Sequence, residues 1–192
     1  MKTRSIFSVI IFIIYLSLVA ILASQCRKSN RGLEVKNAAP IDNATAVNVF
    51  NNVFKAVHSL AWESSLLNGQ QDTIQSNSND NCIDSVFFSN NTDTFPNTVV
   101  IDYGISASSC TGSYNTRGML RSVFSGQYGV SGTVVAIAFS NYEVDSLVVS
   151  GTMTITNQGY NTDSNYVFNI SVSNAKIEFD SINIAWNCSR KY

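Results

Sequence analysis

The sequence has few charged residues, one histidine and two prolines. Only 13% of its 192 residues are charged, whereas an average soluble protein has roughly 25%. Solubility must therefore come from uncharged polar side chains, and the chain has 22 Asn and 27 Ser residues. One histidine, no Cys-x-x-Cys pair and no glycine-rich phosphate loop leave few means of catalysis. The composition favours a β-rich exported protein that is not an enzyme and uses no cofactor.

The charges are divided unevenly along the chain. Between Ala44 and Cys188 four basic residues stand against eleven acidic ones, a balance of −7. Nucleic-acid binding needs clustered positive charge that displaces counterions, so we expect no nucleic-acid partner. The stretch after Cys26 is basic instead, and we interpret it as a solvated tether; its basic residues are Arg27, Lys28, Arg31 and Lys36.

Residues 1–25 have the layout of a secretory signal peptide. Lys2 and Arg4 form a basic start, and an apolar run from Ile6 to Ala23 follows. The run of about 18 residues is near the lower limit for crossing a bilayer. An uncleaved anchor is therefore one alternative to a cleaved signal.

Cys26 follows this run and resembles the lipobox cysteine of bacterial lipoproteins, which carries a lipid after signal cleavage. The preceding residues are Leu22-Ala23-Ser24-Gln25, of which Ala23 and Gln25 differ from the usual pattern. The resemblance implies a cell-envelope lipoprotein that reaches a membrane through a lipid on Cys26. An uncleaved anchor and simple secretion are the alternatives, and all three put the domain outside the cytoplasm.

Residues 44–67 predict one amphipathic helix. Apolar residues recur at steps of three and four, at Ala46, Phe50, Val53, Val57, Leu60 and Leu67. Asn43 or Thr45 suits a cap at its start and Gly69 an end. Because the apolar stripe is narrow, the helix should lie against another element.

From Cys82 onward the apolar period changes to two, which is typical of strands. Short connectors such as Gly126–Gly132 leave no room for crossover helices, so the strands should be antiparallel. We predict a tether over 26–43 and a single mainly-β domain over 44–192. This domain would be a meander of about eight strands, arranged as a sandwich or a half-barrel, with one N-terminal amphipathic helix. The expected strands are Ile83–Phe88, Thr98–Tyr103, Met119–Ser125, Thr133–Tyr142, Val144–Thr156, Tyr166–Val172, Ala175–Phe179 and Ile182–Cys188.

A longer pattern over roughly residues 82–188 resembles a family of exported lipoproteins of Bacteroidota. The pattern is carried by Asp102-Tyr103-Gly104, Cys110-Thr111-Gly112, Thr116-Arg117-Gly118 and Phe139-Ser140-Asn141-Tyr142-Glu143-Val144. The resemblance implies an envelope location and a β-rich fold. It brings no activity, substrate or catalytic residue.

With Cys26 lipidated, three cysteines are left, which allow three single disulfides. We favour Cys82–Cys110, because each lies just outside the hairpin predicted over 83–103, where the chain ends approach each other. The alternative is that all three are free, with Cys188 on the apolar face of the last strand.

Asp followed by Ser or Thr and an aliphatic residue occurs four times, where the composition predicts fewer than one occurrence. The motif is similar to the O-glycosylation acceptor of exported Bacteroidota proteins. Alternatively, polar-to-apolar transitions at strand starts generate it. The acceptor residues would be Thr73, Ser85, Ser146 and Ser181.

No arrangement of residues indicates catalysis or a metal site. His58 lies mid-helix beside the apolar stripe and should be structural. Asp102 and Arg117 face each other across a small-residue loop, where we expect an ion pair, with a ligand clamp as the alternative. Asn161, Asp163 and Asn165 have calcium-loop spacing, but the expected glycine and the twelfth-position acid are missing. A turn explains them better.

The sequence therefore predicts an envelope protein whose domain binds or scaffolds a partner without catalysis. It does not specify whether this partner is a protein or an apolar ligand. The alternative is a carrier that holds an apolar or lipid ligand in a curved-sheet cavity. A carboxylate-dependent enzyme is a weaker third hypothesis.

We expect the domain to face the periplasm. Surface display of Bacteroidota lipoproteins resembles a process keyed by acidic residues after the lipidated cysteine, whereas Arg27, Lys28 and Arg31 occupy that region here. A non-permeant protease added to intact cells should leave the domain whole, and lysed cells provide the control. Degradation without lysis would show that the domain faces outward.

Overall fold

The computed structural model describes residues 27–28, 38–63, 83–90, 94–105, 114–180 and 182–192. These residues form one long helix, α2 (Ala38–Glu63), and an antiparallel sheet. The strands are β1 (Arg27–Lys28), β2 (Ser85–Phe88), β3 (Asn97–Asp102), β4 (Thr116–Phe124), β5 (Val134–Val144), β6 (Leu147–Tyr160), β7 (Tyr166–Phe179) and β8 (Ile182–Lys191).

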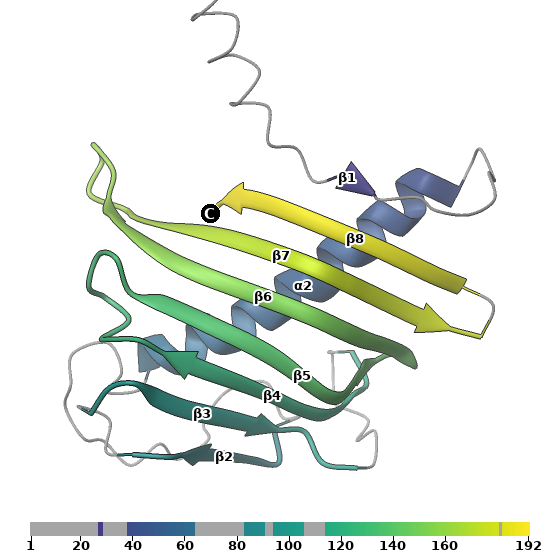
Figure 1. Ribbon diagram of the computed structural model, residues 1–192, viewed down its shortest axis with the longest axis horizontal. Helices are drawn as coiled ribbons and strands as arrows, with labels where there is room; N and C mark the ends of the chain where they lie inside the picture. The colour runs from purple at the N-terminus through teal and green to yellow at the C-terminus, as the bar shows by residue number, and fades with distance from the viewer. Residues whose placement is uncertain (1–26, 29–37, 64–82, 91–93, 106–113, 181) are drawn as a thin grey trace, which may run out of the picture.

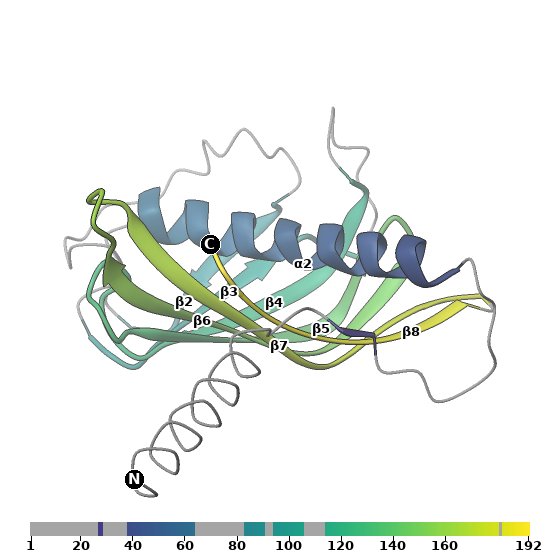
Figure 2. The ribbon, with the colours of Figure 1, turned by 90° about the horizontal axis from the view of Figure 1, so that it is seen from above.

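Strands β2 to β8 lie side by side in chain order, and β1 adds to the outer side of β8 (Figure 1). The sheet is open, because β1 and β2 occupy its two edges. It is also curved, and α2 lies in its concavity (Figure 2). The predicted mainly-β antiparallel meander with one N-terminal helix is confirmed, as one curved sheet and not as a sandwich.

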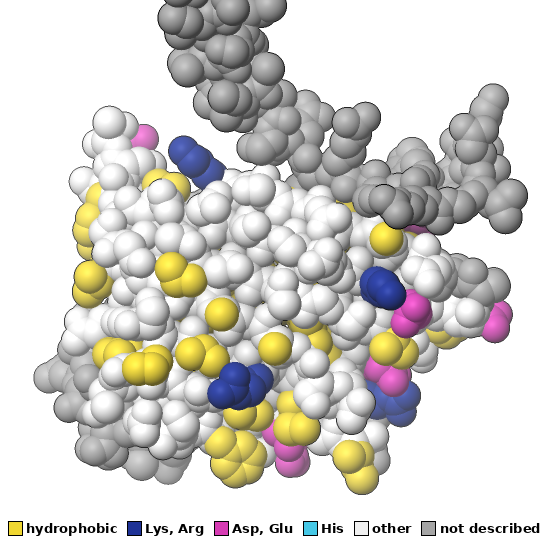
Figure 3. Space-filling model, viewed as in Figure 1, with side chains coloured by type: hydrophobic (Ala, Val, Ile, Leu, Met, Phe, Trp, Pro, Cys, Tyr) yellow, Lys and Arg dark blue, Asp and Glu magenta, His cyan; other side chains and the backbone are white. Residues whose placement is uncertain are grey.

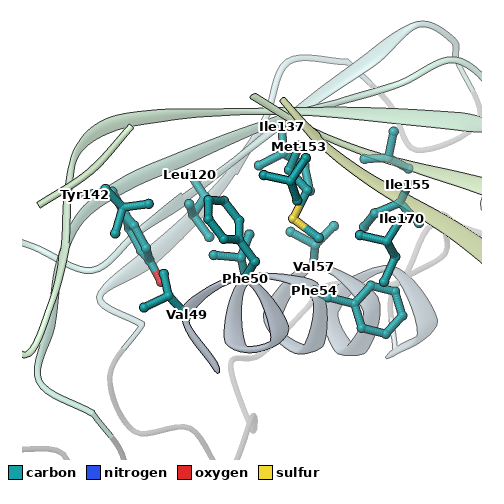
Figure 4. Packing of buried hydrophobic residues seen from close by; sticks show 14 of the residues in the cluster. Val49, Phe50, Phe54, Val57, Leu120, Ile137, Tyr142, Met153, Ile155 and Ile170 are labelled. Carbon is teal, nitrogen blue, oxygen red and sulfur yellow. The ribbon is translucent and has the colours of Figure 1, made fainter. Parts of the chain in front are cut away.

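The apolar stripe of α2 holds the helix in this concavity. Phe50, Val53 and Val57 are fully buried, and Phe50 and Val57 point toward the sheet (Figure 4). The ring of Phe50 stacks on Trp186 with centroids 5.2 Å apart and meets Phe139 edge-on at 5.8 Å. Each fully buried large apolar side chain contributes about 1.5–3 kcal/mol, so this interface contributes substantially to stability.

The opposite, convex face of the sheet is solvated. Most side chains on it are uncharged polar groups, with scattered hydrophobic and charged ones between them (Figure 3). Thr152, Ser173 and Asn187 are exposed strand residues of this kind. Their presence matches the alternation of apolar and polar positions along each strand.

The helix begins at Ala38, earlier than the predicted start at Ala44. Pro40 lies in the first turn, where its missing N–H leaves no helical hydrogen bond unmade. Asn43, predicted as a cap, lies inside the helix, and its Oδ1 accepts a hydrogen bond from Trp186 Nε1 at 3.0 Å. The predicted end at Leu67, with Gly69, lies outside the described residues.

Two parts of the predicted tether belong to the fold. Arg27–Lys28 forms β1 and pairs antiparallel with β8, and residues 38–43 belong to α2. A strand of two residues is too short to show a period, so the sequence pattern contained no signal for β1.

The sequence pattern predicts two strands where the structure has the single strand β7, and a β-bulge explains the difference. The register between β7 and β8 shifts between Val172 and Ala175. Ser173 and Asn174 are both exposed there, and Asn174 has a φ of 52°. The apolar alternation therefore skips one residue. The prediction of separate strands Tyr166–Val172 and Ala175–Phe179 is wrong.

Gly118 should tolerate no side chain. It lies at a bulge in β4 with a φ of 83°, and an added Cβ would lie 2.0 Å from the carbonyl oxygen of Asn141. Gly132 is a matched control, because its φ is 88° and nothing lies within 4 Å of an added Cβ. We expect Gly132→Ala to cost about 1 kcal/mol of unfolding free energy.

Gly118→Ala should cost at least about 2 kcal/mol more than the control, because β4 and β5 must separate to accommodate the methyl group. Urea unfolding of both variants measures this difference. Equal losses would contradict the close approach of the two strands at Gly118.

Candidate functional site

A cleft of about 370 Å³ opens along the C-terminal half of α2. One helix face supplies most of its lining, and the residue after β8 supplies the rest. Two backbone hydrogen bonds with Phe168, at 2.8 and 3.0 Å, fix Tyr192 beside the helix. The lining residues are Phe54, Lys55, His58, Ser59, Trp62, Glu63 and Tyr192.

The floor of the cleft is aromatic and its walls are exposed aromatic rings. Phe54 is 1% exposed, whereas Trp62 is 43% and Tyr192 is 60% exposed. The Phe54 and Tyr192 ring centroids are 4.5 Å apart. His58 stacks between Phe54 at 5.2 Å and Trp62 at 5.6 Å. Four rings therefore line one continuous surface.

His58 is oriented by a tyrosine from the sheet. Its Nδ1 lies 2.8 Å from the hydroxyl oxygen of Tyr128. Burial lowers the pKa of His58 and raises the pKa of Tyr128 well above its ordinary value, so both groups are neutral near pH 7. The sequence predicts a surface or half-buried structural His58, and the half-buried position beside Tyr128 fits the second of these.

The loop that carries Tyr128 is held by a buried amide. Asn157 is 1% exposed, and its Nδ2 donates to the carbonyl oxygen of Tyr128 at 2.8 Å. Its Oδ1 accepts from the N–H of Gly159 at 2.7 Å. Because both ends of this buried amide are hydrogen-bonded, β6 holds the loop in place. The Tyr128 hydroxyl on this loop in turn orients His58.

The lining of the cleft also includes polar side chains. Ser59 Oγ donates to Glu63 Oε1 at 3.1 Å, and His58 uses Nδ1 for Tyr128. Lys55 and Glu63 give the lining one positive and one negative charge. The described part of the chain contains no group of three His, Cys, Asp or Glu residues that could hold a metal ion. The cleft is thus an aromatic surface whose lining includes one positive and one negative side chain.

The predicted pair of Asp102 and Arg117 does not form. Arg117 Nε donates to Glu143 Oε2 at 2.7 Å, because these two residues are directly opposite on β4 and β5. Asp102 Oδ1 accepts from the N–H of Gly104 at 2.8 Å and closes the turn after β3. The ion-pair prediction is therefore wrong, and the ligand clamp has no basis in this geometry.

The loop suggestive of calcium is a hydrogen-bonded turn. Asn161 Oδ1 accepts from the backbone N–H groups of Asp163 and Asn165, both at 2.9 Å. The asparagine oxygen is thus engaged with the backbone of its own loop.

In two of the four Asp-Ser/Thr motifs the aspartate lies in a hairpin connection between two strands. Asp145 and Ser146 have φ values of 48° and 67° between β5 and β6, and Asp180 has 48° between β7 and β8. Such turns need positive φ, which Asp tolerates, so turn chemistry accounts for part of the recurrence. Ser146 is exposed and Ser85 is half-buried. Thr73 and Ser181 lie outside the described residues.

Cys188 is 6% exposed on the apolar face of β8 and is disulfide-bonded. The alternative in which Cys82, Cys110 and Cys188 are all free is therefore wrong. The lipid site at Cys26 and the favoured Cys82–Cys110 pair both lie outside the described residues.

Comparisons of the chain with protein-family models, with curated proteins and with solved structures give no match. Among the described helices, none is long and apolar enough to cross a membrane.

His58→Gln should weaken the pH dependence of stability. Burial lowers the pKa of His58 in the folded protein, so the unfolded chain takes up a proton at a higher pH than the folded one. The resulting stability is present above the unfolded pKa of about 6.5 and is lost as the pH falls toward the lower folded pKa.

Urea unfolding of both proteins between about pH 7.5 and about pH 5 measures this effect. The native protein should lose more stability on acidification than the variant. Because His58 is the sole histidine, the difference between the two profiles belongs to it. Parallel profiles would contradict the burial effect.

Proposed function

We propose that the protein is a non-catalytic binding domain of the cell envelope that binds its ligand in the aromatic cleft of α2. The exposure of Trp62 and Tyr192 on the cleft walls carries this proposal. A concave site lined by aromatic side chains with a few polar groups is the usual form of a ligand site. Trp and Tyr also supply much of the affinity in protein interfaces.

The chemistry of the lining favours an uncharged ligand with a flat face, such as a sugar ring. Aromatic faces carry a negative quadrupole, which attracts the slightly positive C–H groups on one side of a sugar. Lys55, Ser59 and Glu63 surround the rings and would hydrogen-bond the hydroxyl groups at the ring edge. The volume of about 370 Å³ is at the lower end for ligand sites, which suits a ligand of two or three rings.

A location outside the cytoplasm, with the domain facing the periplasm, is part of this proposal. The signal-like residues 1–25 support it. The disulfide at Cys188 supports it as well, because disulfides persist in oxidising compartments and are rare in the cytosol.

The carrier hypothesis needs the concave face of the sheet. α2 occupies this face (Figure 2), and the helix residues Phe50 and Val57 and the sheet residues Leu120 and Ile170 are all fully buried there. An apolar ligand would have to displace the helix, so the cleft between α2 and Tyr192 supports binding better than the concavity does.

Trp62→Ala should weaken sugar binding at least tenfold, the equivalent of roughly 1.4 kcal/mol. The probes are maltotriose, cellotriose and chitotriose, with decanoate as the apolar comparison. Calorimetric titration compares the native protein, Trp62→Ala and Phe179→Ala. Phe179 is a matched control, because it is 45% exposed at the end of β7, away from the cleft.

Sugar binding that survives in Phe179→Ala and is lost in Trp62→Ala supports the proposal. Binding of decanoate alone favours the carrier instead. Absence of binding to every sugar, or equal binding by both variants, overturns the proposed site.

A further inference from the structure

We propose that the sugar site extends beyond the cleft onto the β6–β7 hairpin, where Tyr160 and Tyr166 form a second subsite. This inference rests on the proposed function, because the cleft would bind the first units of a linear oligosaccharide and the hairpin would bind its outer units. The ligand class is then an oligosaccharide longer than the two or three rings that the cleft itself can hold.

Tyr160 and Tyr166 continue the aromatic surface of the cleft. The rings of Trp62 and Tyr166 meet edge-on with centroids 5.4 Å apart, and the centroids of Tyr166 and Tyr160 are 4.3 Å apart. Trp62 lines the cleft, Tyr166 is half-buried and Tyr160 is 63% exposed. A row of contacting rings therefore leads from the cleft wall to an exposed ring on the hairpin.

A β-bulge turns Tyr160 toward the helix side of the sheet. Asn157 pairs with Phe168. The next pair, Tyr160 with Tyr166, lies three residues further along β6 but only two residues back along β7. Gly159 lies in this bulge with a φ of 84°. Because side chains alternate along a regular strand, Tyr160 would point to the convex face without the extra residue; with it, Tyr160 points to the same face as its partner Tyr166.

The turn that joins the two tyrosines is held by hydrogen bonds. The backbone N–H of Asn161 donates to the carbonyl oxygen of Asn165 at 2.9 Å. The Oδ1 of Asn161 also accepts from the N–H groups of Asp163 and Asn165, both at 2.9 Å. A preorganised support loses little conformational freedom on binding, so more of the interaction with the exposed Tyr160 ring is kept as affinity.

The chemistry of the hairpin matches that of the cleft. Between Gln158 and Asn169 the one charged residue is Asp163, and the other polar side chains are neutral. A tyrosine has a ring face that attracts the C–H groups of a sugar and a hydroxyl that can hydrogen-bond its edge. Asp163 would repel an anionic chain, so the hairpin suits the outer units of an uncharged oligosaccharide.

The dependence of affinity on ligand length tests the proposal on the native full chain. The probes are three pairs of trisaccharide and hexasaccharide, from the maltose, cellobiose and chitobiose series, measured by calorimetric titration. We expect the hexasaccharide of the series that binds to bind roughly tenfold more tightly than its trisaccharide, or more. Such a gain exceeds the statistical advantage of the several trisaccharide frames within one hexasaccharide.

Substitutions on β6 and β7 locate this gain. In Tyr160→Ala the hexasaccharide and the trisaccharide should bind with equal affinity, whereas Tyr160→Phe keeps the ring and should keep most of the gain. Phe179→Ala is the matched control and should keep all of it, because Phe179 is 45% exposed at the other end of β7. Circular dichroism and the urea midpoint establish that each variant is folded.

Nitration of the native protein provides a second test that needs no variant. Tetranitromethane modifies exposed tyrosine rings, and mass spectrometry of peptides locates the added nitro groups. Bound hexasaccharide should protect Tyr160, whereas bound trisaccharide should not. Tyr114 is the matched control, because it is 46% exposed just before β4 and should react equally in both samples. If Tyr160→Ala does not fold, this measurement still decides.

The outcomes separate the second subsite from the cleft. A hexasaccharide that binds no more tightly than the trisaccharide overturns the second subsite and leaves the cleft as the site. A gain that persists in Tyr160→Ala, or equal nitration of Tyr160 with either sugar bound, overturns it as well. Absence of binding to all six sugars overturns the proposed function and the second subsite together.

Discussion

The fit of α2 into the concave face of one open sheet is the constraint on which the rest of the structure depends. A single curved sheet has an apolar face that needs a cover, and the stripe around Phe50 provides it. The curvature accompanies bulges, which shift the register in four neighbouring strand pairs from β4–β5 to β7–β8. At Trp62 the helix face turns away from the sheet, so aromatic side chains face solvent there and form the cleft.

Most of the fold could be predicted because local periods report burial directly. The apolar stripe of α2 and the apolar alternation of β8 can be recognised in the sequence without knowledge of distant contacts. The errors arose where one local signal has two causes. Asn43 resembles a cap, but it binds the indole of Trp186, 143 residues away. Likewise, the phase change after Val172 resembles a strand end, but it is a bulge.

The cleft could not be read from the sequence, because its parts are not neighbours in the chain. Tyr128 lies in a loop and Phe168 in β7, and only the folded sheet brings them to His58. Tyr192 follows β8 and contacts Phe54. The partner of Arg117 was missed for a related reason. A cross-strand partner depends on the register of β4 and β5, and a bulge changes that register by one residue. The aromatic content of 11% does not show which rings stay exposed.

The order of elements along the chain determines when the protein can fold. α2 is made before the strands against which it packs, and β8, which carries Trp186, follows the other described strands. Each strand of the meander also needs its successor, so contacts of long sequence separation complete the core. A partly synthesised chain held at a ribosome therefore has no finished surface on which the helix can pack. Before β8 is made, the chain lacks Trp186, the ring on which Phe50 of the helix stacks.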